Sequence, residues 1–202
     1  MNKIKVFIAP TKYFSSSLNY PVNLEKELSE ISLDSLKKQK FAVWGLTSYA
    51  INKFFSIDFD SSKVVRNEFG KPVCLDNNIN FSYSHKNDLI AVAVGCEGVG
   101  VDIEKIDLSR VNDGLINRVL TDAEKEELSK AEDLFLFWTK KEAIFKLNGN
   151  SSQFSPKLID TTSKFTVSNT LFYNGEKYYL SVAANSKIEL EIEVVSSEII
   201  LS

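Results

Sequence analysis

The run LIAVAVGCEGVGVDIE, residues 89–104, constrains the fold of this chain more than any other stretch. Its first half carries no charge and is rich in β-branched residues, which is typical of a strand buried on both faces. Its second half, residues 98–104, also has strand character, but it places Asp102 and Glu104 two positions apart. Side chains two apart on a strand share one face, so the pattern predicts two carboxylates side by side above an apolar core.

Further strands and two helical regions are predicted along the chain. Helices are expected within residues 24–55 and 115–149, where apolar residues recur with a helical period. Thr121 followed by Glu124 predicts a capping box, and Gly149 predicts a helix end. The predicted strand segments are residues 3–10, 63–69, 79–95, 98–104, 164–186 (with a turn at NGE) and 188–196.

This arrangement predicts an α+β protein with one set of helices and strands in each half. We expect two similar α/β-sandwich halves, residues 1–97 and 98–202, related by a pseudo-two-fold axis with an active cleft between them. A chain of 202 residues is long enough to bury a substantial core.

Composition excludes several classes of protein. The net charge of −3 argues against a surface built to bind nucleic acid. The two cysteines, Cys74 and Cys96, form no CxxC pair, so neither a disulfide framework nor a structural zinc site is expected. No apolar stretch approaches the roughly 20 residues that cross a bilayer, and the first ten residues lack a signal-peptide pattern. We therefore expect a cytoplasmic protein without a membrane or nucleic-acid partner. Because both halves lie in one chain, no partner is needed to complete a site between them, and we expect a monomer.

The carboxylates Asp102 and Glu104 admit two interpretations. Neighbouring like charges repel unless a cation lies between them, and oxygen ligands of this kind suit magnesium. Alternatively, both residues mark the solvent end of a strand, with Lys105 nearby as an ion-pair partner. The two residues alone do not decide between a metal site and an exposed strand end.

A second pattern is FWTKKEAIFKLNG, residues 137–149. On a helix Trp138, Glu142 and Lys146 recur every four residues and share a face. The simplest interpretation is an exposed Glu–Lys pair, which stabilises a helix by only about 0.3–0.5 kcal/mol. The alternative is a functional glutamate and lysine facing the strand carboxylates.

Two shorter patterns carry groups that bind phosphate. Ser84 and His85 stand at a predicted hairpin turn, where a hydroxyl, an imidazole and turn amides suit an anion. Gly70, Lys71 and Pro72 combine a backbone open to close approach with a positive charge. Alone, the first pattern is more simply explained as a surface histidine, and the second as an ordinary turn.

Taken in order, GKP, FSYSH, GVGVDIE and WTKKEAIFK resemble the surfactin-synthetase-type phosphopantetheinyl transferases. The resemblance runs from about residue 40 to residue 184, and the last two blocks are the specific pair. It implies transfer of the phosphopantetheine arm of coenzyme A to a serine of an acyl or peptidyl carrier protein.

The resemblance also implies residue roles. The magnesium ligands would be Asp102, Glu104 and Glu142, with Glu142 also the base for the carrier serine. Lys146 would contact the attacked phosphate. Lys141 would lie close to the same phosphate. Ser84 and His85 would bind the ribose phosphate of coenzyme A. The adenine end would be flanked by Gly70, Lys71 and Pro72.

The sequence departs from the family pattern in two places. Ser82 and Tyr83 replace the usual Asn and aliphatic residue, and an early arginine that often binds coenzyme A is absent near Phe41. The candidates to replace it are Lys37, Lys38, Lys40 and Lys53. A magnesium-dependent nuclease and a non-catalytic coenzyme A or carrier-binding protein remain as alternatives. The first would need a basic groove and the second has no need of three carboxylates.

Overall fold

The structure is a computed structural model that describes residues 1–14, 28–29, 31–76, 78–149, 153–195 and 199–201. The helices are α2 (Asp34–Phe55), α3 (Asp113–Val119), α4 (Asp122–Glu126) and α5 (Asp133–Asn148). The strands are β1 (Asn2–Pro10), β2 (Val64–Arg66), β3 (Pro72–Cys74), β4 (Asn80–Lys86), β5 (Leu89–Gly95), β6 (Val99–Lys105), β7 (Phe165–Tyr173), β8 (Glu176–Ala184), β9 (Ile188–Val194) and β10 (Ile199–Leu201). Short 3₁₀ turns include η2 (Ser61–Lys63) and η3 (Leu108–Arg110).

Within the described residues the strands form two four-stranded sheets and one short hairpin. The first sheet has the order β4-β5-β1-β9 and the second the order β10-β7-β8-β6, while β2 pairs with β3. All pairings are antiparallel except that of β1 with β9, which is parallel. The predicted α+β class is confirmed.

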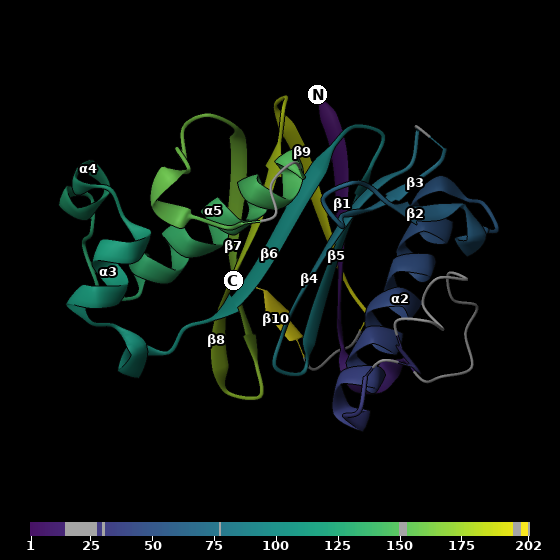
Figure 1. Cartoon of the computed structure of the whole chain (residues 1–202), viewed down its shortest axis with the longest axis horizontal. Coiled ribbons are helices and arrows are strands. Elements are labelled where there is room, and N and C mark those ends of the chain that lie inside the picture. Colours follow the sequence, from purple (N-terminus) through teal and green to yellow (C-terminus); the bar gives the residue numbers. More distant parts are fainter. Residues whose placement is uncertain (15–27, 30, 77, 150–152, 196–198, 202) are drawn as a thin grey trace.

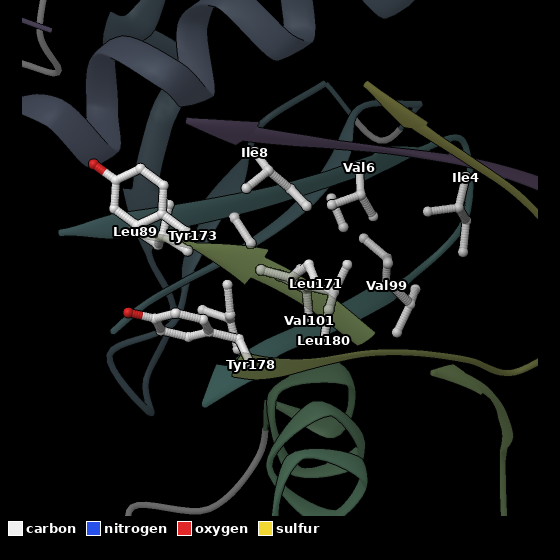
Figure 2. Close-up of a cluster of buried hydrophobic side chains, with 14 of the residues drawn as sticks. Ile4, Val6, Ile8, Leu89, Val99, Val101, Leu171, Tyr173, Tyr178 and Leu180 are labelled. Atoms are coloured by element: carbon white, nitrogen blue, oxygen red, sulfur yellow. The ribbon is translucent and has the colours of Figure 1, made fainter. Parts of the chain in front are cut away.

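The two sheets pack against each other and each carries one long helix on its outer face. Figure 2 shows the core between the sheets, where side chains of β1 such as Ile4 and Val6 meet Val101 of β6 and Leu180 of β8. Helix α2 covers the other face of the first sheet, and α5 covers the other face of the second. Figure 1 shows these two helices on opposite sides of the molecule.

The predicted elements largely agree with the structure, with three corrections. The hairpin turn predicted at Ser84 and His85 lies further along, because β4 continues to Lys86 and β5 begins at Leu89. The long helix α2 begins at Asp34, because residues 31–33 are not helical. The N-terminal part of that predicted helix, including Leu24, lies outside the described residues. The predicted strand at 63–69 is shorter, since β2 ends at Arg66 and the chain then turns.

Strand β9 joins the sheet of the N-terminal half. Its residues pair with β1 in parallel, from Ile188 beside Asn2 to Val194 beside Ile8. The two sheets therefore do not separate at residue 97. The pseudo-two-fold relation and the division into residues 1–97 and 98–202 stay predictions.

Strands β4 and β6 meet where the two sheets come together. The main-chain N–H of Val101 donates to Ser82 Oγ at 3.2 Å, so a side chain of one sheet partners the edge of the other. This gives Ser82, one of the departures from the family pattern, a structural role. Among the described residues, no helix has the length and apolar character needed to cross a membrane.

Candidate active site between β6 and α5

A glycine on β6 brings helix α5 close to the strand. A Cβ on Gly100 would lie 1.9 Å from Ala143 O and 2.5 Å from Leu147 N, both in the backbone of α5. No side chain fits there. Because Gly100, Asp102 and Glu104 share one face of β6, this close contact places the two carboxylates directly beside the helix.

Asp102 lies in a hydrogen-bonded cluster with a serine and a lysine. Lys146 Nζ of α5 donates to Asp102 Oδ1 at 2.7 Å and to Ser84 Oγ at 2.9 Å. Ser84 Oγ in turn donates to the same oxygen of Asp102 at 2.7 Å. Asp102 is only 5% exposed, so it is not the solvent-exposed end of a strand. The structure thus brings together three residues predicted from separate motifs.

Glu104 is held by two other cations. Lys86 Nζ at the end of β4 lies 2.6 Å from Glu104 Oε1, and Arg110 of η3 donates to the same oxygen at 2.8 Å. Neither partner was predicted from the sequence. Lys105, the partner considered there, pairs instead with Glu176.

Glu142 stands one helical turn before Lys146 and is half-buried. Burial is the largest cause that raises its pKa to about 7, and the negative charges of Asp102 and Glu104 raise it further. The positive charge of Lys146 acts in the opposite direction. A carboxylate with a pKa near neutrality is suited to accept a proton at physiological pH.

Because of this raised pKa, the contribution of Glu142 to the free energy of unfolding depends on pH. Folding favours the protonated acid, so its contribution to stability is fully present below pH 4.5, the ordinary pKa of a glutamate, and is lost as pH rises through about 7. Without metal, Glu142→Gln should therefore increase the free energy of unfolding by about 3 kcal/mol at pH 8 and by little at pH 4. Thermal unfolding in EDTA at both pH values measures this difference, and an equal effect at both would contradict it.

The FSYSH motif is divided between two faces of β4. Ser82 and Ser84 face β6, whereas Tyr83 and His85 face the side of α2. There His85 lines a cavity of about 90 Å³ together with Lys40 and Arg66. Desolvation by its surroundings and the charge of Lys146 lower the pKa of His85, so the imidazole is neutral at neutral pH.

A larger pocket of about 260 Å³ lies between the GKP loop and the end of α5. Its walls come from three of the sequence motifs, namely GKP, FSYSH and the helix that carries Lys146. The lining residues are Arg66, Phe69, Gly70, Lys71, Pro72, Phe81, Ser82, Tyr83, Phe145, Lys146 and Gly149. Arg66 lines both cavities, and it was not among the residues considered as substitutes for the missing early arginine.

Lys141 does not lie at this site. It is fully buried, and its Nζ donates to Glu124 Oε2 at 2.6 Å and to Val119 O at 2.9 Å. Glu124 also accepts from the N–H of Thr121, which completes the predicted capping box of α4. The expected position of Lys141 near the attacked phosphate is thus not observed, because its side chain leaves α5 toward α3 and α4.

Lys141→Met should destabilise the protein while leaving the affinity for coenzyme A unchanged. Removing one partner of a buried ion pair costs about 3 kcal/mol, which corresponds to a melting temperature lower by roughly 6–12 °C. Thermal unfolding measures the loss, and calorimetric titration with coenzyme A is the control. A weakened affinity with an unchanged melting temperature would instead place Lys141 at the substrate.

The donors at the site fit a divalent cation in chemistry, although they do not form a ready-made ligand set. Within the part of the chain that the structure describes, no three His, Cys, Asp or Glu side chains are grouped to hold a metal ion. Instead, cationic side chains contact Asp102 and Glu104. Burial is the main cause of the raised pKa of Glu142, and the charge of Asp102 adds to it, so a cation bound beside both carboxylates would favour the ionised form of Glu142.

Comparison with known proteins finds a family match in the part of the chain that carries these carboxylates. Residues 98–194 match the 4'-phosphopantetheinyl transferase superfamily. The match covers just under half of the chain. The "4'-phosphopantetheinyl transferase gsp" of Aneurinibacillus migulanus is 31% identical over 90 residues, which cover 42% of this chain. The alignment spans 37% of that relative, little more than a third of its length.

The superfamily match includes Asp102, Glu104, Glu142 and Lys146. The GKP loop and the FSYSH strand lie before residue 98, so the match does not include them. Their assignment to the same site rests on the structure, which places both against α5.

Proposed function

We propose that the protein transfers the 4'-phosphopantetheine group of coenzyme A to a serine of an acyl or peptidyl carrier protein, in a magnesium-dependent reaction. The observation that carries the proposal is the cluster of Asp102, Ser84 and Lys146 with the half-buried Glu142 beside it. This cluster adjoins the 260 Å³ pocket, whose walls come from the GKP and FSYSH motifs and from α5. Phosphoryl-linked transfer needs charge neutralisation and a base, and both are available there.

The nucleotide of coenzyme A is assigned to the 260 Å³ pocket. Gly70 and Pro72 offer backbone at the adenine end, and the exposed ring of Phe69 offers a stacking surface. The ribose phosphate is assigned to the cavity between Lys40, Arg66 and His85. A guanidinium and an ammonium there supply the positive charge that the missing early arginine provides in the family pattern.

Magnesium, when bound, would neutralise the coenzyme A pyrophosphate and stabilise charge on the oxygen that leaves. Asp102 and Glu142 are the residues proposed to hold it. Glu104, which is occupied by Lys86 and Arg110, is assigned a supporting contribution to the same negative field. Lys146, which partners Asp102 in this structure, is proposed to turn to the pyrophosphate when the cation binds.

In the proposed reaction, two residues of α5 act on the reacting groups: Glu142 accepts a proton and Lys146 stabilises negative charge. The carrier serine Oγ attacks the phosphorus that bears the pantetheine arm, and its proton passes to the carboxylate of Glu142. The bond from that phosphorus to the oxygen of adenosine bisphosphate breaks, and the nucleotide leaves with its electron pair. Lys146 Nζ stabilises the negative charge that develops on the phosphate oxygens.

A labelling reaction tests the function. The protein is incubated with a fluorescent coenzyme A, magnesium chloride and several apo carrier proteins, and labelled carrier is followed by gel electrophoresis. We expect label on at least one carrier, lost with EDTA and reduced about 10²–10⁴-fold by Glu142→Gln. Binding of coenzyme A without label on any carrier would indicate a binding protein. Cleavage of a plasmid without label would indicate a nuclease.

We further propose that the protein acts as a cytoplasmic monomer with coenzyme A and a carrier domain as its partners. The groups assigned to nucleotide, metal and proton transfer all come from this one chain, so no second copy is needed to complete them. Size-exclusion chromatography with light scattering tests the oligomeric state.

A further inference from the structure

The side chain of Lys71, the lysine of the GKP loop, reaches the C-terminal end of α5. Its Nζ donates to Lys146 O at 2.6 Å and to Leu147 O at 3.3 Å. The last carbonyl groups of a helix have no partner within the helix, and a cation there also interacts favourably with the helix dipole. Lys71 therefore acts on α5 as a C-terminal cap supplied by the other half of the chain.

Asn67 and Gly149 support the contact between Lys71 and the end of α5. Asn67 Nδ2 donates to Gly149 O at 3.1 Å, while Asn67 Oδ1 accepts from the N–H of Lys71 at 2.9 Å. A Cβ on Gly149 would lie 2.5 Å from Lys71 Cδ, so this glycine leaves room for the lysine stem. Gly149 also has a φ of +57°, which a glycine adopts at a helix end without strain.

The cap acts on the residue whose side chain contacts Asp102. The main-chain carbonyl of Lys146 accepts from Lys71, while its Nζ donates to Asp102 and Ser84. The loop that lines the proposed nucleotide pocket is thereby linked to the proposed phosphate ligand through one residue. The half-buried lysine stem fits this role, and its desolvation lowers the pKa of Lys71.

We propose that Lys71 is a positioning residue, which caps α5 and fixes the main chain at Lys146, and that its ammonium is not a contact of the substrate phosphates. The part of this inference that concerns catalysis rests on the proposed function. The capping itself concerns the protein without ligands and is tested separately.

Amide hydrogen exchange of the protein without coenzyme A or metal tests the cap. In Lys71→Met we expect amides 146–149 to exchange about tenfold faster than in the wild type, because charge-assisted bonds to the helix end are lost. Amides of α2 should be unchanged. Lys71→Arg should restore protection, and Lys63→Met, a change of an exposed lysine just before the same hairpin, is the matched control. If Lys71→Met does not fold, Lys71→Gln takes its place.

Kinetics separate positioning from substrate binding. We expect Lys71→Met to lower kcat about tenfold with less than about a threefold change in KM for coenzyme A. The kcat/KM ratio between coenzyme A and dephospho-coenzyme A should stay the same. Unchanged exchange at residues 146–149 together with a KM raised more than about tenfold would overturn the proposal and make Lys71 a substrate contact. If the wild type transfers no phosphopantetheine, the exchange result still decides the cap, and the failure belongs to the proposed function.

Discussion

Asp102→Asn is expected to reduce phosphopantetheine transfer by about 10³-fold. Asparagine keeps the shape of the residue but removes the charge that attracts Lys146 and the proposed magnesium ion. It also leaves Ser84 without its anionic acceptor. Initial rates of carrier labelling, followed over a range of magnesium concentrations, measure the effect.

Glu104→Gln is the matched control for that change. It removes the same charge from the same face of β6, but from the carboxylate that Lys86 and Arg110 already neutralise. We expect a loss of about tenfold or less, and little change in Mn²⁺ affinity measured by calorimetry. Asp102→Asn should weaken Mn²⁺ binding strongly. Equal losses in the two variants, or Asp102→Asn activity within tenfold of the wild type, would contradict the assignment of Asp102.

Gly100→Ala is expected to destabilise the protein by about 3 kcal/mol and to lower transfer by at least about 10²-fold. The added methyl group would overlap the backbone of α5 at Ala143 and Leu147, which cannot move without shifting the whole helix. Glu142 and Lys146 would then shift away from Asp102. Thermal unfolding gives the loss of stability, and labelling at a temperature where the variant is folded gives the loss of activity.

Gly98→Ala provides the comparison for Gly100→Ala. Its new Cβ would lie 3.4 Å from the side-chain Cδ1 of Leu147, which is ordinary van der Waals contact. We expect its melting temperature and activity to stay close to those of the wild type. A Gly100→Ala protein as stable and active as Gly98→Ala would show that α5 does not depend on the close contact.

The local parts of the fold were predictable because they depend on neighbours in the sequence. The alternation in residues 98–104 correctly placed Val101 and Ile103 in the core and the carboxylates on the other face. The capping box of Thr121 and Glu124 was likewise readable from their spacing, and the structure confirms it. The break before Asp34 was missed, since the helical period of the apolar residues continues through it.

The contacts between distant segments were not predictable from the sequence. The family resemblance implied a place for Lys141 close to the substrate, but successive helix residues point in different directions, and Lys141 turns to a buried glutamate. The sequence offers Lys71 as a positive charge for a phosphate, yet its ammonium donates to a helix end 75 residues away in the sequence. Arg66 carries no motif signal and is recognised only through the cavities it lines.

The pairing of β1 with the distant strand β9 affects how the protein folds during synthesis. One sheet neighbour of β1 is β5, and the other, β9, follows only at residue 188. Until then, β1 presents an open edge to which strands of other chains can bind. Contacts of such long sequence separation slow folding, and the sheet that contains β1 is completed only after residue 194 has been synthesised. Splitting the gene between the two sheets would therefore yield two fragments, of which the first lacks an edge strand and the second carries an unpaired one.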